Sequence, residues 1–460
     1  MSFEEVCRRV EAAFEADWQA AGELGRMERL EREKRAIMGF EEDVNWYKEK
    51  IGQIIEEGFM NHVLPPGWYN SLKDGVFYEL YGLAGLAPWA YDEREEYRKS
   101  SSAKLIGDRL YCLIDGRSQL QPQRIGAARR EQLKRALLLA TPRERLEKGF
   151  HEVYLKNGIR ITIYSGQRTK EGQDVMVFRK YILQDLSFKE LVKLETIPEE
   201  AVPLFLKMIK IGFNVIFAGP VRSGKTSFMQ VWQRHEDPAL EGLAISTDPE
   251  TPWHSIMPDA PLMQLVADGD DLENITKSLL RGDNDYIILE EMRDGQAYNI
   301  ALEITSAGTR RCKATIHTDD PVGLPFKMAS KIRTRYGGDM QGIILQIFRN
   351  FNYIFEFYSL EDDRGRKKLK AIWAYDFDEE KACPVVWPIC RYEPDLGVWT
   401  WKSHLGEAKK QMGGLRPEDL QEMEEIMKEL ENRNPMIKGE PVYPRYYRPD
   451  ITANPQRCSL

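Results

Sequence analysis

The segment Gly219-Pro-Val-Arg-Ser-Gly-Lys-Thr226 lies between an apolar run, Phe213–Ala218, and a helix-prone stretch that begins at Ser227. Its spacing is that of a P-loop, in which glycines let backbone N–H groups curl around phosphate oxygens. The N-terminal end of the following helix adds a positive potential at the same place. A Gly-rich turn that merely carries Lys-Thr is the alternative, and the flanking elements argue against it. The segment therefore predicts a nucleoside triphosphate site in an α/β domain, with ATP as the expected ligand.

Two side chains of this loop are expected to contact the nucleotide and its ion. Lys225 would reach the β- and γ-phosphates, and Thr226 would ligate Mg²⁺. The predicted nucleotide-binding residues are Gly219, Pro220, Val221, Arg222, Ser223, Gly224, Lys225, Thr226 and Ser227.

Length and charge limit the class of protein. The chain has 460 residues, enough for two or three domains that each bury a core. Its net charge of −8 argues against bulk nucleic acid or an anionic membrane surface as the main partner. The basic segment Arg129–Arg135 is interpreted as one solvated helix face, so no direct nucleic-acid binding is expected.

Cysteine spacing and hydropathy indicate the compartment. The six cysteines show no Cys-x-x-Cys spacing, which favours reduced thiols over a disulfide framework or a zinc site. Cys383 and Cys390 form the only close pair in the sequence. No apolar run reaches the roughly 18 residues of a membrane span, and no signal peptide is evident. We therefore expect a cytoplasmic protein without a transmembrane segment.

The first half of the chain predicts helices followed by a small α+β domain. Apolar residues recur at helical spacing over residues 3–57, which indicates amphipathic helices packed on a domain; a supercoiled arm is the alternative. Residues 103–114 predict a hairpin that ends at Gly116, and residues 125–139 predict a helix. Further strands are predicted in residues 152–164 and 174–181.

The second half has another pattern, in which short apolar runs alternate with helical segments. This alternation predicts a doubly wound, largely parallel sheet whose strands end at a common ligand site. The runs are Val215–Ala218, Leu243–Ser246, Tyr286–Leu289 and Lys313–Ile316. The predicted organisation is a helical extension (1–70), an α+β domain (71–190), a linker (191–205), a P-loop domain (206–405) and a helical, then irregular, Pro- and Tyr-rich tail (406–460).

Acidic and imidazole side chains follow several of these predicted strands. A P-loop ATPase needs carboxylates beside Mg²⁺, one to hold the ion and one to orient the attacking water. Glu290 and Glu291 follow Tyr286–Leu289, so Glu290 is a predicted Mg²⁺ ligand and Glu291 would hold the ion through water. Asp248 and His317 follow two other strands. The predicted catalytic residues are Glu291, His317, Glu290 and Asp248.

Five sequence boxes then occur in a characteristic order. They are the P-loop, Thr247-Asp248-Pro249, Glu291-Met-Arg293, Ser306-Ala-Gly308 and Thr315-Ile-His317-Thr. This order resembles the type II/type IV secretion ATPase superfamily and, within it, most resembles the CpaF-type ATPases of Flp (tight-adherence) pilus assembly. The resemblance spans roughly residues 75–400 and includes Glu79–Ala87, Ile106–Tyr111, Gly158–Arg160 and Val177–Lys180.

The resemblance implies a fold, an assembly and a set of partners. It implies a RecA-like domain preceded by an α+β domain, in a homohexameric ring that binds ATP and Mg²⁺ between domains. It further implies a cytoplasmic motor at the inner membrane, held there by a platform protein. Arg160, Arg179 and Arg281 are candidates for the arginines that compensate phosphate charge in such sites. Glu291 would polarise water, and His317 would sense the phosphate.

Three positions depart from the family pattern. Pro220-Val-Arg222 replaces the usual Gly-Thr-Gly, Glu290 stands where glycine is usual, and Thr247 stands where glutamate is usual. These departures bear on turnover more than on nucleotide binding. The leading hypothesis is a motor for pilus assembly or protein secretion. The alternatives are a conjugation- or retraction-type ATPase and a catalytically weak, nucleotide-dependent scaffold.

Overall fold

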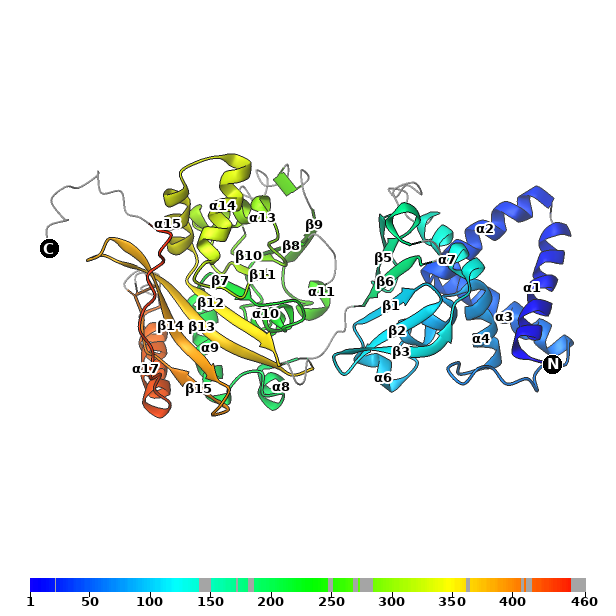
Figure 1. Ribbon diagram of the computed structural model, residues 1–460, viewed down its shortest axis with the longest axis horizontal. Coiled ribbons are helices and arrows are strands. Elements are labelled where there is room, and N and C mark those ends of the chain that lie inside the picture. The colour runs from blue at the N-terminus through cyan, green and yellow to red at the C-terminus, as the bar shows by residue number, and fades with distance from the viewer. Residues whose placement is uncertain are drawn as a thin grey trace. The chain divides into compact units, whose positions relative to one another are not determined.

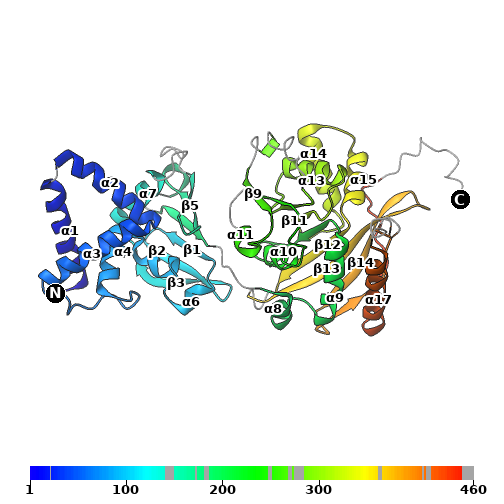
Figure 2. The same ribbon diagram turned by 180° about the vertical axis from the view of Figure 1, so that it is seen from behind.

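The computed structural model divides the chain into two compact units, Met1–Gln184 and Asp185–Leu460, each with its own sheet (Figures 1 and 2). The structure describes residues 1–460 except 21, 140–149, 171–172, 181–185, 247–250, 268–271, 274–283, 361–364, 407–408, 411–415 and 448–460. Among the helices in these described ranges, none combines the length and apolar character needed to cross a bilayer.

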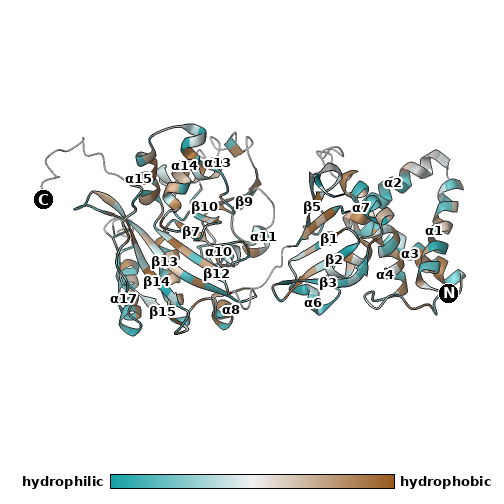
Figure 3. Cartoon of the chain, in the orientation of Figure 1, coloured by the Kyte–Doolittle hydropathy of each residue, from teal (hydrophilic) through white to brown (hydrophobic). Residues whose placement is uncertain are grey.

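The first unit begins with amphipathic helices that pack on its core, as predicted. On α1 (Phe3–Ala20) the residues Val6, Val10 and Phe14 are buried at helical spacing, while the remaining face is polar (Figure 3). Tyr47 of α3 stacks on Tyr81 of α4 with ring centroids 4.3 Å apart. The other helices of this unit are α2 (Gly22–Met38), α3 (Glu41–Glu57), α4 (Leu72–Tyr81), η1 (Ala84–Leu86), α5 (Ala87–Ala90), α6 (Glu95–Arg98), α7 (Ala127–Leu139) and η3 (Gly166–Arg168).

The sheet of the first unit is six-stranded and antiparallel, in the order β3-β2-β1-β6-β5-β4. Its strands are β1 (Ser102–Ile106), β2 (Arg109–Ile114), β3 (Arg117–Arg124), β4 (Phe150–Tyr154), β5 (Arg160–Tyr164) and β6 (Val175–Arg179). The predicted hairpin of residues 103–114 is confirmed as β1 and β2, and it ends at a turn in which Asp115 and Gly116 have positive φ. The sequence did not predict that the chain continues after this turn as β3. That strand is mostly exposed and polar, so it lacks the apolar alternation that identifies a strand.

The second unit contains a nine-stranded sheet in the order β15-β14-β13-β12-β7-β11-β10-β8-β9. The strands from β12 to β9 in that order are parallel, and β13, β14 and β15 extend the sheet with antiparallel pairing. The strands are β7 (Val215–Ala218), β8 (Gly242–Ser246), β9 (Leu262–Val266), β10 (Tyr286–Leu289), β11 (Lys313–Ile316), β12 (Tyr353–Ser359), β13 (Lys367–Asp378), β14 (Cys383–Glu393) and β15 (Val398–Trp401). This is the RecA-like α/β fold that the sequence predicted, with an antiparallel extension.

Helices cover both faces of this second sheet, which is why its central strands β7, β8, β10 and β11 are buried along their whole length. In β7, Val215 and Phe217 pack with α9 and α10, whereas Ile216 and Ala218 pack with α13, α14 and α15. The helices of this unit are α8 (Phe188–Lys193), η4 (Glu199–Ala201), α9 (Val202–Ile211), α10 (Lys225–Gln233), α11 (Trp253–Ile256), α13 (Gly295–Ser306), α14 (Leu324–Tyr336), α15 (Met340–Asn350) and α17 (Pro417–Arg433).

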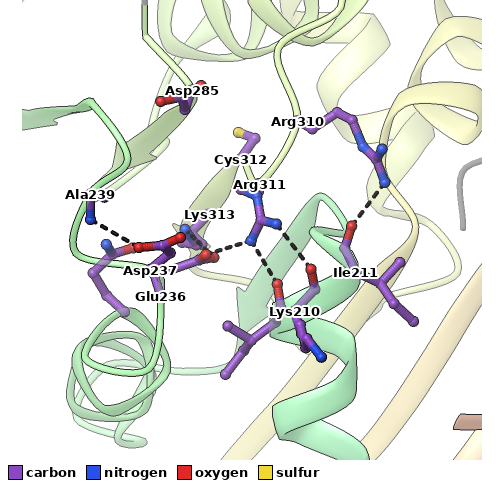
Figure 4. A network of polar contacts seen from close by, with 12 residues as sticks. Lys210, Ile211, Glu236, Asp237, Ala239, Asp285, Arg310, Arg311, Cys312 and Lys313 are labelled. Atoms are coloured by element: carbon purple, nitrogen blue, oxygen red, sulfur yellow. Dashed lines mark hydrogen bonds and ion pairs between the residues drawn. The ribbon is translucent and has the colours of Figure 1, made fainter. Parts of the chain in front are cut away.

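A buried ion-pair network ties the helix after the P-loop to the start of β11 (Figure 4). Glu236, just beyond α10, lies 2.8 Å from Nζ of Lys313 and 2.6 Å from Arg311. Arg311 also donates to the carbonyls of Ile209 and Lys210 at 2.8 and 2.9 Å. Burial lowers the pKa of Lys313, and the nearby Glu236 carboxylate opposes this shift. The network therefore holds α9, α10 and β11 together at one end of the sheet.

We expect Glu236→Gln to lower the free energy of unfolding of this unit by about 3 kcal/mol, because it leaves the buried Lys313 ammonium without a carboxylate. Urea denaturation followed by circular dichroism measures the change. The matched control is Glu190→Gln, which removes an exposed pair with Lys193 and should cost less than about 1 kcal/mol. If both variants lost the same free energy of unfolding, the buried network would contribute no more to stability than an exposed ion pair, which would contradict this prediction.

Candidate nucleotide site

The P-loop connects β7 to α10, and its two glycines occupy conformations that other residues avoid. Gly219 has φ of +146°, and a Cβ there would lie 2.2 Å from the carbonyl oxygen of Phe357. Gly224 has φ of +94° and caps α10 in a left-handed conformation. Arg222 also has positive φ, +64°, which is uncommon for a residue with a side chain. The loop backbone is therefore held close to β12, with the N-terminus of α10 at its end.

Lys225 is buried and bonded to its own loop. Its Nζ donates to the carbonyl oxygen of Pro220 at 2.7 Å and lies 3.1 Å from Nδ1 of His317. Burial lowers the pKa of Lys225 to about 8, although the Glu291 carboxylate favours the charged form. Lys225 is thus positioned at the mouth of the loop by the Pro220 carbonyl and His317.

Glu291 and His317 form the next contacts of this polar chain. Nε2 of His317 lies 2.9 Å from Oε1 of Glu291, and Arg293 donates to Oε2 of Glu291 at 2.6 Å. Burial alone would raise the pKa of Glu291, but hydrogen bonds from His317 and Arg293 outweigh it and lower the pKa to about 2. Glu291 is therefore an ionised carboxylate at neutral pH.

The two ring nitrogens of His317 have different neighbours. Nδ1 lies 3.1 Å from Nζ of Lys225 and 3.4 Å from the carbonyl oxygen of Gly219, whereas Nε2 faces the Glu291 carboxylate. His317 therefore links the P-loop lysine to the carboxylate. Its backbone oxygen accepts a bond from Nζ of Lys327 at 2.7 Å.

Strand order explains why these side chains meet. β11 lies between β7 and β10, and both pairings are parallel. The P-loop, His317 and Glu291 each follow the carboxyl end of one of these strands, so they share one edge of the sheet. The structure thus brings together Lys225, His317 and Glu291, which are separated widely in the sequence.

Glu290 lies in a different environment from Glu291. The indole N–H of Trp253, a fully buried residue of α11, donates to Oε1 of Glu290, and Thr315 Oγ1 donates to its backbone oxygen at 2.9 Å. Consecutive residues of an extended chain point to opposite sides, so Glu291 faces the P-loop and Glu290 faces Trp253. The sequence analysis did not predict a role for Trp253. The available signal was that a buried carboxylate such as Glu290 needs a hydrogen-bond donor.

The remaining candidates are distributed between the two units. Arg160 of β5 and Arg179 of β6 are register partners in the first unit, where Arg160 is buried and Arg179 is exposed. Thr226 and Ser227 lie half-buried in the first turn of α10. Asp248 and Arg281 lie outside the described residues.

Ser223 shows that the loop suits a phosphate ligand. Its side chain is fully buried, and its Oγ has no hydrogen-bond partner within the described part of the chain. The same Oγ would lie 2.7 Å from a Cβ at position 219, so only glycine leaves room beside it. A buried hydroxyl without a partner, next to the lysine and the helix N-terminus, is consistent with a site for phosphate oxygens.

Comparison with known proteins identifies one family. Residues 170–331 match the family described as type II/IV secretion system protein. A search of curated proteins finds no match. Among solved structures, the VirB11 ATPase of the Brucella suis type IV secretion system, in complex with sulphate, is 15% identical, covering 63% of this chain and 92% of its own, with a TM-score of 0.33.

Two further solved structures are similar at the same level. The pilus retraction motor PilT with bound ADP is 17% identical, covering 59% of this chain and 78% of its own, with a TM-score of 0.45. The Legionella pneumophila ATPase DotB is 14% identical, covering 75% and 88%, with a TM-score of 0.46. The segment 170–331, which matches the model of the type II/IV secretion system protein family, contains the P-loop, Glu291 and His317.

Proposed function

We propose that this protein is an ATP-hydrolysing motor of a pilus-assembly or protein-secretion machine. The observation that carries the proposal is the contact chain Lys225–His317–Glu291, which joins a P-loop lysine to an ionised carboxylate at one edge of a parallel sheet. The match of residues 170–331 to the type II/IV secretion family supports the same class of activity.

The residues of the site suit ATP with Mg²⁺. Backbone N–H groups from Val221 to Thr226 and the ammonium of Lys225 would hold the phosphates. Thr226 would ligate Mg²⁺, with Glu291 acting on the ion through water. The bound ion would neutralise charge on the transferred phosphoryl group. Asp248 remains a further catalytic candidate from the sequence.

The low pKa of Glu291 defines what this carboxylate does. A group with a pKa of about 2 is a weak base, so it orients and polarises the attacking water better than it removes a proton. His317, which lies between Glu291 and Lys225, would report the arrival of phosphate to the carboxylate. When the phosphates attract Lys225 away from the Pro220 carbonyl, His317 would lose its contact with the lysine and could reorient toward the nucleotide.

We further propose the finer assignments that the sequence suggests. These are a CpaF-type ATPase in a homohexamer, cytoplasmic and bound to an inner-membrane platform protein. Arg160, Arg179 and Arg281 are the candidate arginines that would reach the nucleotide across a domain boundary. The ordered sequence boxes support the subfamily, and a conjugation- or retraction-type machine is the main competing assignment.

A nucleotide-dependent scaffold with weak turnover is the second candidate. Three observations favour it: Lys225 is engaged by its own loop, Arg222 holds a strained backbone conformation, and Glu290 adds a buried carboxylate near the strand end. Each would slow hydrolysis without preventing nucleotide binding.

Mg²⁺-dependent ATP hydrolysis is the decisive test. We expect turnover per chain to rise with protein concentration as the ring assembles. Lys225→Ala should abolish nucleotide binding, and Glu291→Gln should lower kcat by about a hundredfold or more while ATP still binds. ATP binding without turnover at every concentration would instead identify the scaffold.

ATP affinity should depend on pH through Lys225. Its ammonium is present below a pKa of about 8 and is lost as the pH rises, so affinity should fall by up to about tenfold per unit above pH 8. Phosphates favour the charged form, so binding near pH 8 should take up protons. Calorimetry in two buffers of different ionisation enthalpy measures this uptake. In Lys225→Arg the charge persists, so the same pH range should produce no uptake.

Glu290 can be tested separately from Glu291. Because its carboxylate contacts the Trp253 indole, we expect Glu290→Gln, which keeps an acceptor there, to change the half-saturating Mg²⁺ concentration by less than about threefold. Titration of ATPase activity with Mg²⁺ measures this value. An increase of about tenfold or more, with no change in Trp253→Phe, would establish Glu290 as a metal ligand, as the sequence predicted.

A further inference from the structure

The segment of residues 434–447, here named the C-terminal strap, crosses the antiparallel edge of the second sheet after α17. The backbone of Trp401 bonds to Asn434 and Met436 at 2.8 and 2.9 Å. Val442 then pairs with Val386 of β14 through bonds of 2.8 and 2.9 Å. β15 pairs only with Cys390–Glu393 of β14, so the strap occupies the edge that β15 leaves open.

Beyond that edge, the strap reaches the helices on one face of the sheet. Figures 1 and 2 show the chain passing from α17 to the region of α15. Tyr443 donates to Oδ2 of Asp378 at 2.7 Å on the β13–β14 hairpin. The ring centroids of Tyr446 and of Phe326 in α14 lie 5.4 Å apart. Gln341 of α15 donates to the backbone oxygen of Tyr446 at 3.5 Å.

The hydroxyl of Tyr446 contacts the loop that begins at His317. It donates to the carbonyl oxygen of Val322 at 2.6 Å. The adjacent carbonyl of Pro321 accepts from Tyr375 of β13 at 2.5 Å. The residues from His317 to Gly323 belong to no strand, and side chains donate to the carbonyl oxygens of His317, Pro321 and Val322. Tyr446 thus supplies one of the bonds that fix the loop carrying His317.

We propose that Tyr446 of the C-terminal strap is a positioning residue for His317, because it anchors the loop between that histidine and α14. The strap does not touch the P-loop through any of these contacts. Its effect on the site passes along the chain from Val322 to His317, whose imidazole links Lys225 to Glu291. Loss of the anchor would let the histidine leave Glu291 more often while the P-loop kept its shape.

This inference predicts that the strap influences hydrolysis more than nucleotide binding. The expected effect of the strap on turnover rests on the proposed function, whereas its expected effect on the loop of residues 317–323 does not. The Pro- and Tyr-rich character of the tail then has a physical reason: prolines reduce the set of accessible conformations, and tyrosines supply both ring contacts and hydroxyl donors.

The test compares Tyr446→Phe with Tyr443→Phe in the full chain. Each variant loses one strap hydroxyl and keeps its ring, but only Tyr446 bonds to the histidine loop. Hydrogen exchange of peptides covering residues 317–323 should be about three- to tenfold faster in Tyr446→Phe, the range for losing one hydrogen bond, and unchanged in Tyr443→Phe. Tyr375→Phe should resemble Tyr446→Phe, because it releases the neighbouring carbonyl.

Kinetics give a second readout that general destabilisation would not reproduce. We expect kcat of Tyr446→Phe to fall about two- to fivefold with an unchanged Kd for ATP, and Tyr443→Phe to match the unmodified protein in both values. Unchanged exchange in Tyr446→Phe, or equal acceleration in Tyr443→Phe, would overturn the proposal. If the unmodified protein shows no turnover, the proposed function fails, while the exchange experiment still decides the role of the strap.

Discussion

Parallel pairing of β7 with β11, and of β11 with β10, is the constraint on which the rest of this structure depends. Parallel strands run in the same direction, so the loops at their carboxyl ends all lie at one edge of the sheet. Lys225, His317 and Glu291 meet there for that reason. The buried Glu236–Lys313 pair acts at the other end of the same strands and fixes where β11 starts. One sheet therefore aligns a lysine, an imidazole and a carboxylate.

The polar chain at this edge runs from the Pro220 carbonyl through Lys225 and His317 to Glu291. The Nζ atom of Lys225 donates a hydrogen bond to the Pro220 carbonyl and contacts His317. Burial lowers the pKa of Lys225 to about 8. A triphosphate offers the lysine a stronger, charged acceptor. Glu291 stays ionised in either case, because Arg293 and His317 both stabilise its charge. His317 contacts both Lys225 and Glu291, which makes the loop after it a natural place for control.

Elements outside the parallel sheet support that loop. β13 contributes Tyr375, and the C-terminal strap contributes Tyr446, so the antiparallel extension and the tail both bond to the segment between His317 and α14. The strap also closes the free edge of β14 through Val442. The C-terminal strap therefore both covers the edge of β14 and supports the loop that carries His317. Glu290 likewise joins the site to Trp253 and the neighbouring α11.

Four parallel strands, β7, β8, β10 and β11, together with the P-loop and the candidacy of Glu291 and His317, could be predicted from the sequence, because apolar runs, glycine spacing and residue chemistry are local properties. The same reasoning missed β3, which is mostly exposed and polar, the partly exposed parallel strand β9, and the extension formed by β14 and β15. The folded chain was needed to show that Lys225 contacts His317, that Glu290 faces Trp253, and that Tyr446 reaches Val322. These are contacts between residues far apart in the chain, and their partners depend on strand order and side-chain direction, which no local pattern encodes.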